Sequence, residues 1–159
     1  MFLIGDRIVH PLHGAGVIED IVERTIDGAP AQYYAVRPAF GDTQLFIPVD
    51  GCARLGIRPV CSREDAEALI ARLDSVTPGA NKGWNQRYRE NMLHIRSGDL
   101  YEVALVIKSL SARDRERGLS NGEKKMLSSA RQIIVSELAF ALDRAPEEVD
   151  ALIIHKLCE

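Results

Sequence analysis

The sequence predicts an α+β protein, in which a small N-terminal antiparallel β domain (residues 1–60) is followed by a compact C-terminal domain of five helices (residues 61–159). Two patterns predict it. Apolar residues alternate with a period near two up to about residue 50, and they recur with the helical period from Ser62 onward. With 159 residues, of which 46% are hydrophobic and 27% charged, the chain can bury one core or two small ones. This composition excludes a disordered chain, a collagen and a coiled-coil rod.

Short strands separated by turn residues account for the N-terminal part. The pair Asp27-Gly28 supplies the positive φ of a tight hairpin turn between the second and third strands. Four or five strands this short cannot build a wide sandwich, so we expect a small, strongly bent barrel of the SH3 or Tudor type. The expected strands are Arg7 to Val9, Gly16 to Arg24, Tyr33 to Arg37 and Gln44 to Ile47.

Capping residues mark the helices of the C-terminal part. Ser62 can cap the first helix and Asp99 the third. Ser120 and Glu123 have the spacing of a capping box ahead of the longest helix, and Pro146 suits the first turn of the last one. The expected helices run from Ser62 through Leu73, from about Trp84 to Arg96, from Asp99 to Gly118, from Ser120 through Leu142, and onward from Pro146.

Charge is distributed unevenly along the chain, although the net charge of -3 argues against a simple nucleic-acid binder. Residues 82–131 hold 11 basic and 6 acidic side chains, whereas residues 1–60, 61–81 and 132–159 are each acidic. Lysines and arginines that only solvate helix faces would produce the same excess. The positions of these cations must therefore decide between a solvated surface and a nucleic-acid interface.

Neither a membrane span nor an export signal is expected. The apolar runs are far shorter than the roughly 20 residues that cross a bilayer. The N-terminus, Met1-Phe-Leu-Ile-Gly-Asp-Arg7, carries its charge after a very short apolar stretch, which is the wrong order for a signal peptide. Three cysteines without a CxxC spacing indicate reduced thiols. We expect a cytoplasmic protein.

Histidines and cysteines offer one candidate metal site. His10 and His13 share a glycine-containing loop, and Cys52 and Cys61 lie in the same half, so four zinc ligands are available in principle. The spacing is poor, and residues 11–16 are better interpreted as a tight turn between strands. No GxSxG, GxxxxGK(S/T) or GxGxxG motif occurs. We predict no enzyme, no metal and no cofactor, with a metal-dependent enzyme using His10, His13 and a cysteine as the alternative.

A stronger candidate is the segment Lys82-Gly-Trp84-Asn-Gln-Arg87-Tyr88-Arg89, which joins the single tryptophan to several cations at a helix start. One interpretation is a core tryptophan surrounded by solvated arginines. The other is an aromatic wedge that enters the DNA minor groove and partly unstacks the bases, while the cations bind phosphates. The cationic window also contains Lys124, Lys125 and Arg131, which favours nucleic acid.

Several motifs follow one another along nearly the whole chain. They are Gly5-Asp6-x-x-Val9-x-Pro11-x-His13-Gly14-x-Gly16, Arg24-Thr25-Ile26-x-Gly28, Trp84-x-x-Arg87-Tyr88-Arg89, Ser97-Gly98-Asp99, Val103-Ala104-x-Val106, Arg113-Asp114-x-Glu116-Arg117-Gly118-Leu119-Ser120-x-Gly122-Glu123-Lys124-x-Met126-Leu127 and Ala130-Arg131-Gln132-Ile133-x-Val135-x-Glu137-Leu138. Each is weak alone, but their order and coverage are specific. Together they resemble the CarD family of bacterial RNA polymerase-binding transcription regulators.

The resemblance implies an N-terminal Tudor-like domain, similar to the polymerase-interacting domain of transcription-repair coupling factor, that binds the RNA polymerase β subunit. The helical domain would then touch promoter DNA. Trp84 would wedge into the minor groove at the upstream edge of the melted bubble and stabilise the open complex. With the cationic window included, the expected DNA-binding residues are Trp84, Arg87, Arg89, Lys82, Lys124, Lys125 and Arg131. The expected polymerase-binding residues are Arg24, Thr25, Phe46, Ile47 and Pro48.

Two residues depart from the family pattern. Gln86 stands where some members carry an arginine, and Phe46 stands where some place an arginine at the polymerase surface. No basic tail follows the helical core, so the chain resembles a short, stand-alone regulator.

Few phosphate contacts are expected, so free DNA should bind no more tightly than non-specific binders do, with dissociation constants of roughly 10⁻⁴ to 10⁻⁶ M, and with little sequence readout. Docking on the polymerase would raise the effective concentration of DNA. The alternative is a polymerase-binding adaptor that does not touch DNA. We expect a monomer without a small-molecule substrate.

Overall fold

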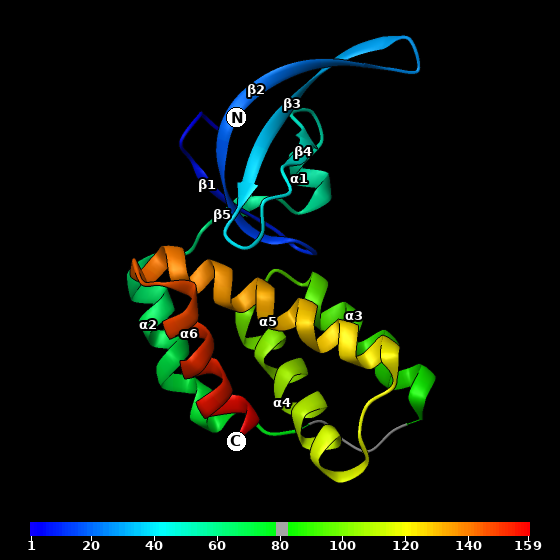
Figure 1. The fold of residues 1–159 in the computed structure, drawn as a ribbon, viewed down its shortest axis with the longest axis vertical. Coiled ribbons are helices and arrows are strands. Elements are labelled where there is room, and N and C mark those ends of the chain that lie inside the picture. The colour runs from blue at the N-terminus through cyan, green and yellow to red at the C-terminus, as the bar shows by residue number, and fades with distance from the viewer. Residues whose placement is uncertain (79–82) are drawn as a thin grey trace.

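The computed structural model describes residues 1–78 and 83–159, so Lys82 of the expected DNA-binding set lies outside the described residues. An antiparallel β part (residues 1–61) occupies one end of the molecule, and a helical part (the described residues from 62 onward) occupies the other (Figure 1). The predicted α+β class is confirmed at this level, because a five-stranded sheet comes first along the chain and the main helices follow.

The sheet is open, which corrects the predicted barrel. Its order is β4-β3-β2-β1-β5, so β4 and β5 are edges that do not pair with each other. Both edge strands are too short to close a barrel by curling toward one another. The strands are β1 (Arg7–His10), β2 (Gly14–Ile26), β3 (Ala29–Pro38), β4 (Leu45–Pro48) and β5 (Arg58–Pro59).

The β2–β3 hairpin turns where the sequence predicts it. Asp27 and Gly28 have φ values of 54° and 78°, the two positive angles of a tight hairpin turn. Both strands are longer than predicted, because their backbones keep pairing beyond the core as far as Ile26 and Ala29. This exposed arm projects from the sheet (Figure 1), and the strand pair has a register irregularity between Ile18 and Asp20, within the part that covers the core.

Six α-helices are present in the described residues, one more than the five expected. The unpredicted helix is α1, which has only four residues between Gly51 and Gly56 and therefore shows no apolar period. The 3-10 turn Leu73–Ser75 follows α2, and the π-helical turn Ile154–Cys158 follows α6. The helices are α1 (Cys52–Leu55), α2 (Arg63–Arg72), α3 (Trp84–Arg96), α4 (Leu100–Arg117), α5 (Asn121–Leu142) and α6 (Pro146–Ile153).

The predicted caps are confirmed. The Ser62 side chain accepts a hydrogen bond from the Asp65 amide at 3.0 Å, and Asp99 accepts one from the Tyr101 amide at 2.9 Å. Ser120 caps α5 in a reciprocal box with Glu123. These local hydrogen bonds explain why the helix starts are readable from the sequence.

Helix α5 lies between the rest of the helical part and the sheet (Figure 1). One side packs in the helical core through Ile134 and Leu138, both 0% exposed. A separate, smaller core under the sheet contains Ile8, Ile18, Tyr34, Val36, Ile47 and Ile57. Because α5 touches both parts, its C-terminal half is buried nearly all round, as expected for a helix that is apolar on several faces. No helix among the described residues is long and apolar enough to cross a membrane.

Candidate nucleic-acid and protein interfaces

Trp84 is the first residue of α3, directly after the Gly83 cap, and its side chain is 48% exposed. Its ring stacks on that of Tyr88 one turn later, with centroids 5.4 Å apart and an interplanar angle of 21°. The interpretation of Trp84 as a core residue is therefore wrong. The stack restrains the indole while it leaves much of the ring accessible to a partner.

Arg87 is placed differently from its neighbours. Its side chain is only 15% exposed, and its Nη2 lies 3.6 Å from Oε2 of Glu123 in the first turn of α5. Arg113 of α4 places its Nε at the same distance from the same oxygen. The buried carboxylate of Glu123 therefore joins α3, α4 and α5, and it takes part in the helix cap as well.

The remaining predicted cations divide into two sets. Arg89, Lys124 and Lys125 are exposed, and the two lysines directly follow Glu123, which pairs with Arg87. Arg131 lies about two turns further along α5, where its Nη2 is 2.9 Å from both carboxylate oxygens of Asp150 in α6. The helices that carry Trp84 and the two lysines thus begin at the same end of the helical part (Figure 1), whereas Arg89 lies about 140° around α3 from Trp84 and Arg131 is paired elsewhere.

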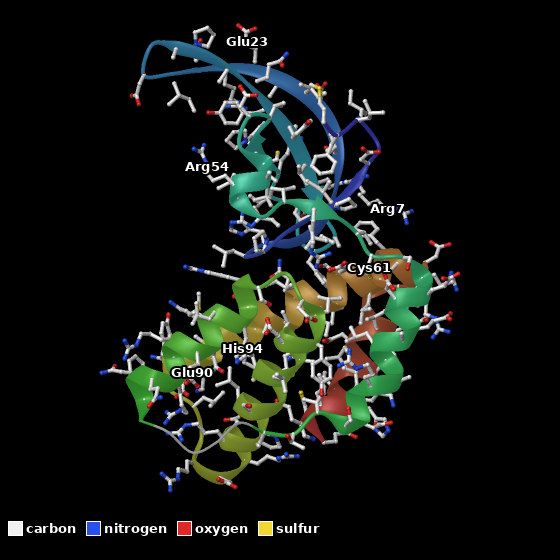
Figure 2. The ribbon with its side chains drawn as sticks, turned by 180° about the vertical axis from the view of Figure 1, so that it is seen from behind. Arg7, Glu23, Arg54, Cys61, Glu90 and His94 are labelled. Atoms are coloured by element: carbon white, nitrogen blue, oxygen red, sulfur yellow. The ribbon has the colours of Figure 1, made fainter. Side chains whose placement is uncertain are left out.

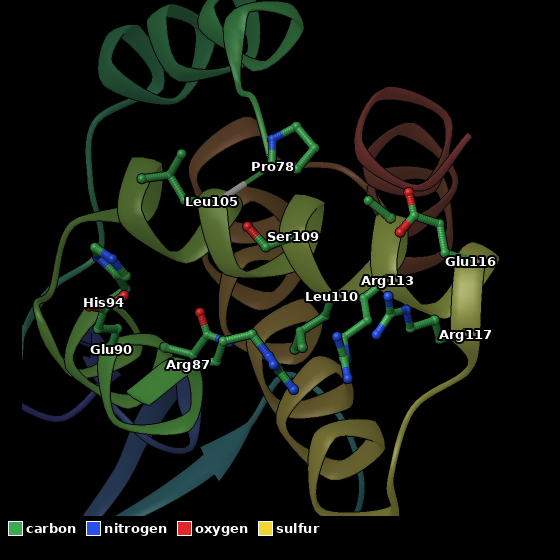
Figure 3. Close-up of a pocket in the computed structure, with 12 residues that line it drawn as sticks. Pro78, Arg87, Glu90, His94, Leu105, Ser109, Leu110, Arg113, Glu116 and Arg117 are labelled. Carbon is green, nitrogen blue, oxygen red and sulfur yellow. The ribbon is translucent and has the colours of Figure 1, made fainter. Parts of the chain in front are cut away.

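A cavity of about 350 Å³ lies between α3 and α4 (Figure 3). Sequence reasoning missed it, since it forms only when the two helices pack. Its charged lining mixes both signs, so its chemistry selects neither an anion nor a cation. The charged or titratable lining residues are Arg87, Glu90, His94, Arg113, Glu116 and Arg117.

On the β part, Arg24 and Phe46 form a pair across the sheet. The Arg24 guanidinium carbon lies 4.0 Å from the centroid of the Phe46 ring, and that ring is 38% exposed. Arg24 belongs to β2 and Phe46 to β4, with β3 between them. A cation over an exposed aromatic face presents both charge and apolar area to a partner.

The other residues expected to bind polymerase do not share this pair's position. Ile47 is 4% exposed and belongs to the core under the sheet. Thr25 is exposed on the β2–β3 arm, one residue out of phase with Arg24 and therefore on the opposite face. Pro48 pairs with Tyr33 at the end of β4.

The candidate zinc ligands are not brought together. His10 and His13 have ring centroids 4.5 Å apart, but the described residues contain no group of three or more His, Cys, Asp or Glu that could hold a metal. The His10 Nδ1 accepts a hydrogen bond from the Leu12 amide at 3.0 Å, and burial, aided by His13, lowers the pKa of His10 to about 4. The Cys52 thiol donates to the Pro48 carbonyl at 3.1 Å.

An open antiparallel sheet that carries an arginine–aromatic pair, joined to a helical part with an exposed tryptophan, defines a two-part protein with two separate candidate binding surfaces. Residues 2–61 match the family model of the CarD-like/TRCF RID domain, and residues 68–154 match that of the CarD C-terminal domain. The chain belongs to the CarD family, which confirms the resemblance found in the sequence.

A relative from Bacillus subtilis supports the same class. The chain is 35% identical over 138 residues to the Bacillus subtilis (strain 168) protein called "Putative transcription factor YdeB". The match covers 87% of this chain and 90% of that relative. Membership of this transcription factor family is consistent with a regulator of transcription.

Proposed function

We propose that the protein regulates transcription by binding the RNA polymerase β subunit through its β part while Trp84 contacts promoter DNA and stabilises the open complex. The observation that carries the proposal is the half-exposed indole of Trp84, which stacks on Tyr88 at the start of α3. A large aromatic side chain that is restrained but accessible suits insertion at a partly unstacked base step in the minor groove.

The surrounding charges support a contact with the DNA backbone. Lys124 and Lys125 are exposed in the first turn of α5, whose Glu123 pairs with Arg87 of α3, and they would reach phosphates beside the inserted ring. Arg89 lies about 140° around α3 from Trp84, on the side of Leu93, so we leave it out of this contact. Arg87, which faces Glu123, would act mainly by fixing α3 against α5. A few phosphate contacts on an acidic protein keep the affinity for free DNA low, so stable placement on a promoter requires the polymerase.

The polymerase contact is assigned to the outer face of the sheet around Arg24 and Phe46. Membership of the family whose N-terminal domain matches the CarD-like/TRCF RID model supports this assignment. The phenylalanine offers apolar area where some relatives carry an arginine, and the stacked Arg24 retains one positive charge there.

The lifetime of promoter open complexes tests the function. Wild-type protein is expected to lengthen the lifetime formed by the cognate polymerase, and Trp84→Ala is expected to lose that effect while it still binds polymerase. Leu93→Ala provides the matched control, because Leu93 is 70% exposed on the same helix but lies on its opposite side. An unchanged lifetime with bound wild-type protein would overturn the proposal.

A polymerase-binding adaptor that leaves DNA untouched is the second candidate. The pairing of Arg87 with Glu123 and of Arg131 with Asp150 favours it, since these cations are already engaged within the protein. In that case Trp84→Ala would alter the binding of a protein partner and leave the open-complex lifetime unchanged.

A further inference from the structure

The C-terminal half of α5 forms hydrogen bonds with separate segments of the β part. We call the contacts of Ser136, Glu137 and Phe140 with these segments the α5 junction. The Ser136 Oγ accepts from the Ala15 amide of β2 at 2.8 Å. The Phe140 carbonyl accepts from Arg7 Nη1 of β1 at 3.1 Å, and the Arg7 guanidinium also lies over the Phe140 ring.

Glu137 forms the centre of this junction and is 0% exposed. Its two carboxylate oxygens accept from Nη1 and Nη2 of Arg58 at 2.7 and 2.6 Å, the bidentate geometry in which both ions are strongly oriented. Oε2 also accepts from the Cys61 amide at 2.9 Å. One carboxylate thus binds both the edge strand β5 and the first residues after it, where the β part ends.

Glu137 shifts the pKa values of two neighbouring groups. Hydrogen bonding to Glu137 raises the pKa of Arg58. Burial and the charge of Glu137 raise the pKa of Cys61 to about 12, so this thiol stays protonated and inert at neutral pH. Figure 2 shows Cys61 where the β part meets α5, with Arg7 nearby.

Gly14 brings the two parts into direct backbone contact. A Cβ atom at this position would lie 2.5 Å from the Ser136 Oγ and 3.3 Å from the Gln132 carbonyl oxygen. Such an approach is possible only for glycine, whose φ of +82° is also unfavourable for other residues. The same face of α5 therefore fits closely against the β part and forms hydrogen bonds with it.

The opposite end of α5 contacts the helix that begins with Trp84, because Glu123 pairs with Arg87 of α3. Glu123 and Glu137 are 14 residues apart, which corresponds to about 21 Å along a helix. A tilt of about 10° at the junction would therefore move the Glu123 turn, and α3 with it, by roughly 4 Å. A displacement of that size would separate an inserted ring from its base step.

We propose that Glu137 and Arg58 are positioning residues, which hold α5 at a fixed angle to the sheet and so set where Trp84 lies relative to the polymerase-bound β part. This inference rests on the proposed function for its consequence, although the fixed angle can be measured without polymerase. Neither residue would touch DNA or polymerase. Their effect would pass through the rigid body of α5.

Residual dipolar couplings of backbone amides test the fixed angle directly, since the chain of 17.6 kDa is small enough for such measurements. In the wild type, one alignment tensor should fit both the sheet and the helices. Glu137→Gln should require two tensors, because an amide cannot accept the two parallel hydrogen bonds of Arg58. The matched control is Asp150→Asn, which removes a carboxylate from a bidentate arginine pair within the helical part and should keep one tensor.

Open-complex lifetimes with the same proteins test the consequence. Glu137→Gln should bind polymerase as the wild type does and yet shorten the lifetime to that seen with Trp84→Ala, whereas Asp150→Asn should behave as the wild type. A single tensor for Glu137→Gln overturns the inference, and so does a wild-type lifetime despite two tensors. If the wild type itself leaves the lifetime unchanged, the proposed function fails, and the tensors alone then decide whether the junction fixes the angle.

Two further pairs of variants keep the test decisive if Glu137→Gln fails to fold. Gly14→Ala and Gly28→Ala impose similar φ strain, but a Cβ at Gly28 meets nothing within 4 Å. Only Gly14→Ala should separate the tensors. Arg58→Lys, which keeps the charge, should retain more of the common alignment than Arg58→Gln. Equal behaviour within both pairs would overturn the inference.

Discussion

The two ends of α5 each bury a glutamate, but they use it differently. At the C-terminal end, Glu137 binds Arg58 at 2.6 to 2.7 Å with both oxygens. At the N-terminal end, Glu123 is 3.6 Å from Arg87 and from Arg113, and it also serves the helix cap. The short, aligned pair suits a fixed connection between two parts of the molecule. The longer contacts support a surface whose aromatic residues remain exposed.

The largest expected effect comes from removing the two glutamates in turn. Glu137→Ala should lower the free energy of unfolding by about 3 to 5 kcal/mol, because it leaves the partly buried Arg58 without its partner. Glu123→Ala should lose about 2 to 3 kcal/mol, since it also removes a buried carboxylate from partly buried arginines, but at the longer distance of 3.6 Å. Urea denaturation followed by circular dichroism measures both losses. Equal losses would contradict the distinction between the ends.

Two glycine substitutions should distinguish the cost of steric overlap with the Glu137 end of α5 from the cost of backbone strain alone. Gly14→Ala should lower the free energy of unfolding by roughly 2 to 4 kcal/mol, combining an unfavourable φ with overlap on Ser136. Gly28→Ala, which meets open space, should lose about 1 to 2 kcal/mol from φ alone. Thermal unfolding of the two variants under identical conditions checks the order, and a larger loss for Gly28→Ala would refute it.

The cap at the other end should have a smaller effect. Ser120→Ala removes the side chain that accepts from the Glu123 amide at 3.3 Å, so we expect a loss of about 1 kcal/mol in the free energy of unfolding. Hydrogen exchange should rise in the first turn of α5 and remain unchanged around Glu137. Faster exchange throughout α5 would show that the two ends are not independent.

At neutral pH the smallest effect is expected from His10 in β1, which pairs with Gly14. Its pKa is lowered from 6.5 to about 4 in the folded protein, so the unfolded chain binds more protons between these values. Stability should therefore fall as the pH drops from about 6.5 to 4. His10→Asn should remove this part of the acid loss and leave stability at pH 8 nearly unchanged, as measured by denaturation across pH. A His10→Asn variant whose stability falls as steeply as that of the wild type over this pH range would contradict the lowered pKa of His10.

Features determined by short stretches of sequence were predictable. The turn at Asp27-Gly28 and the caps at Ser62, Asp99 and Ser120 depend on residues within a few positions, and all are confirmed. Helix α1 and the open edges of the sheet were missed, because four residues between two glycines carry no period and closure depends on strands far apart in the chain.

The candidate sites were predictable only in part. The residue types around Trp84 could be read from the sequence, but the engagement of Arg87 by Glu123 and of Arg131 by Asp150 arises from helix packing. One feature of the sequence does indicate the α5 junction. Ser136 and Glu137 interrupt a continuous apolar run from Ile133 to Leu138, and polar residues inside a helix that is apolar on all sides indicate a buried polar contact.

A photo-crosslinking amino acid placed at position 84 provides the most direct test of the central claim, that Trp84 contacts promoter DNA while the β part is bound to polymerase. In complexes of this protein with polymerase and promoter, it should crosslink to DNA at the upstream edge of the bubble. The same group at position 93, on the opposite side of α3, should not. Crosslinks from position 84 to protein alone, in complexes that retain the variant, would contradict the account and support the adaptor.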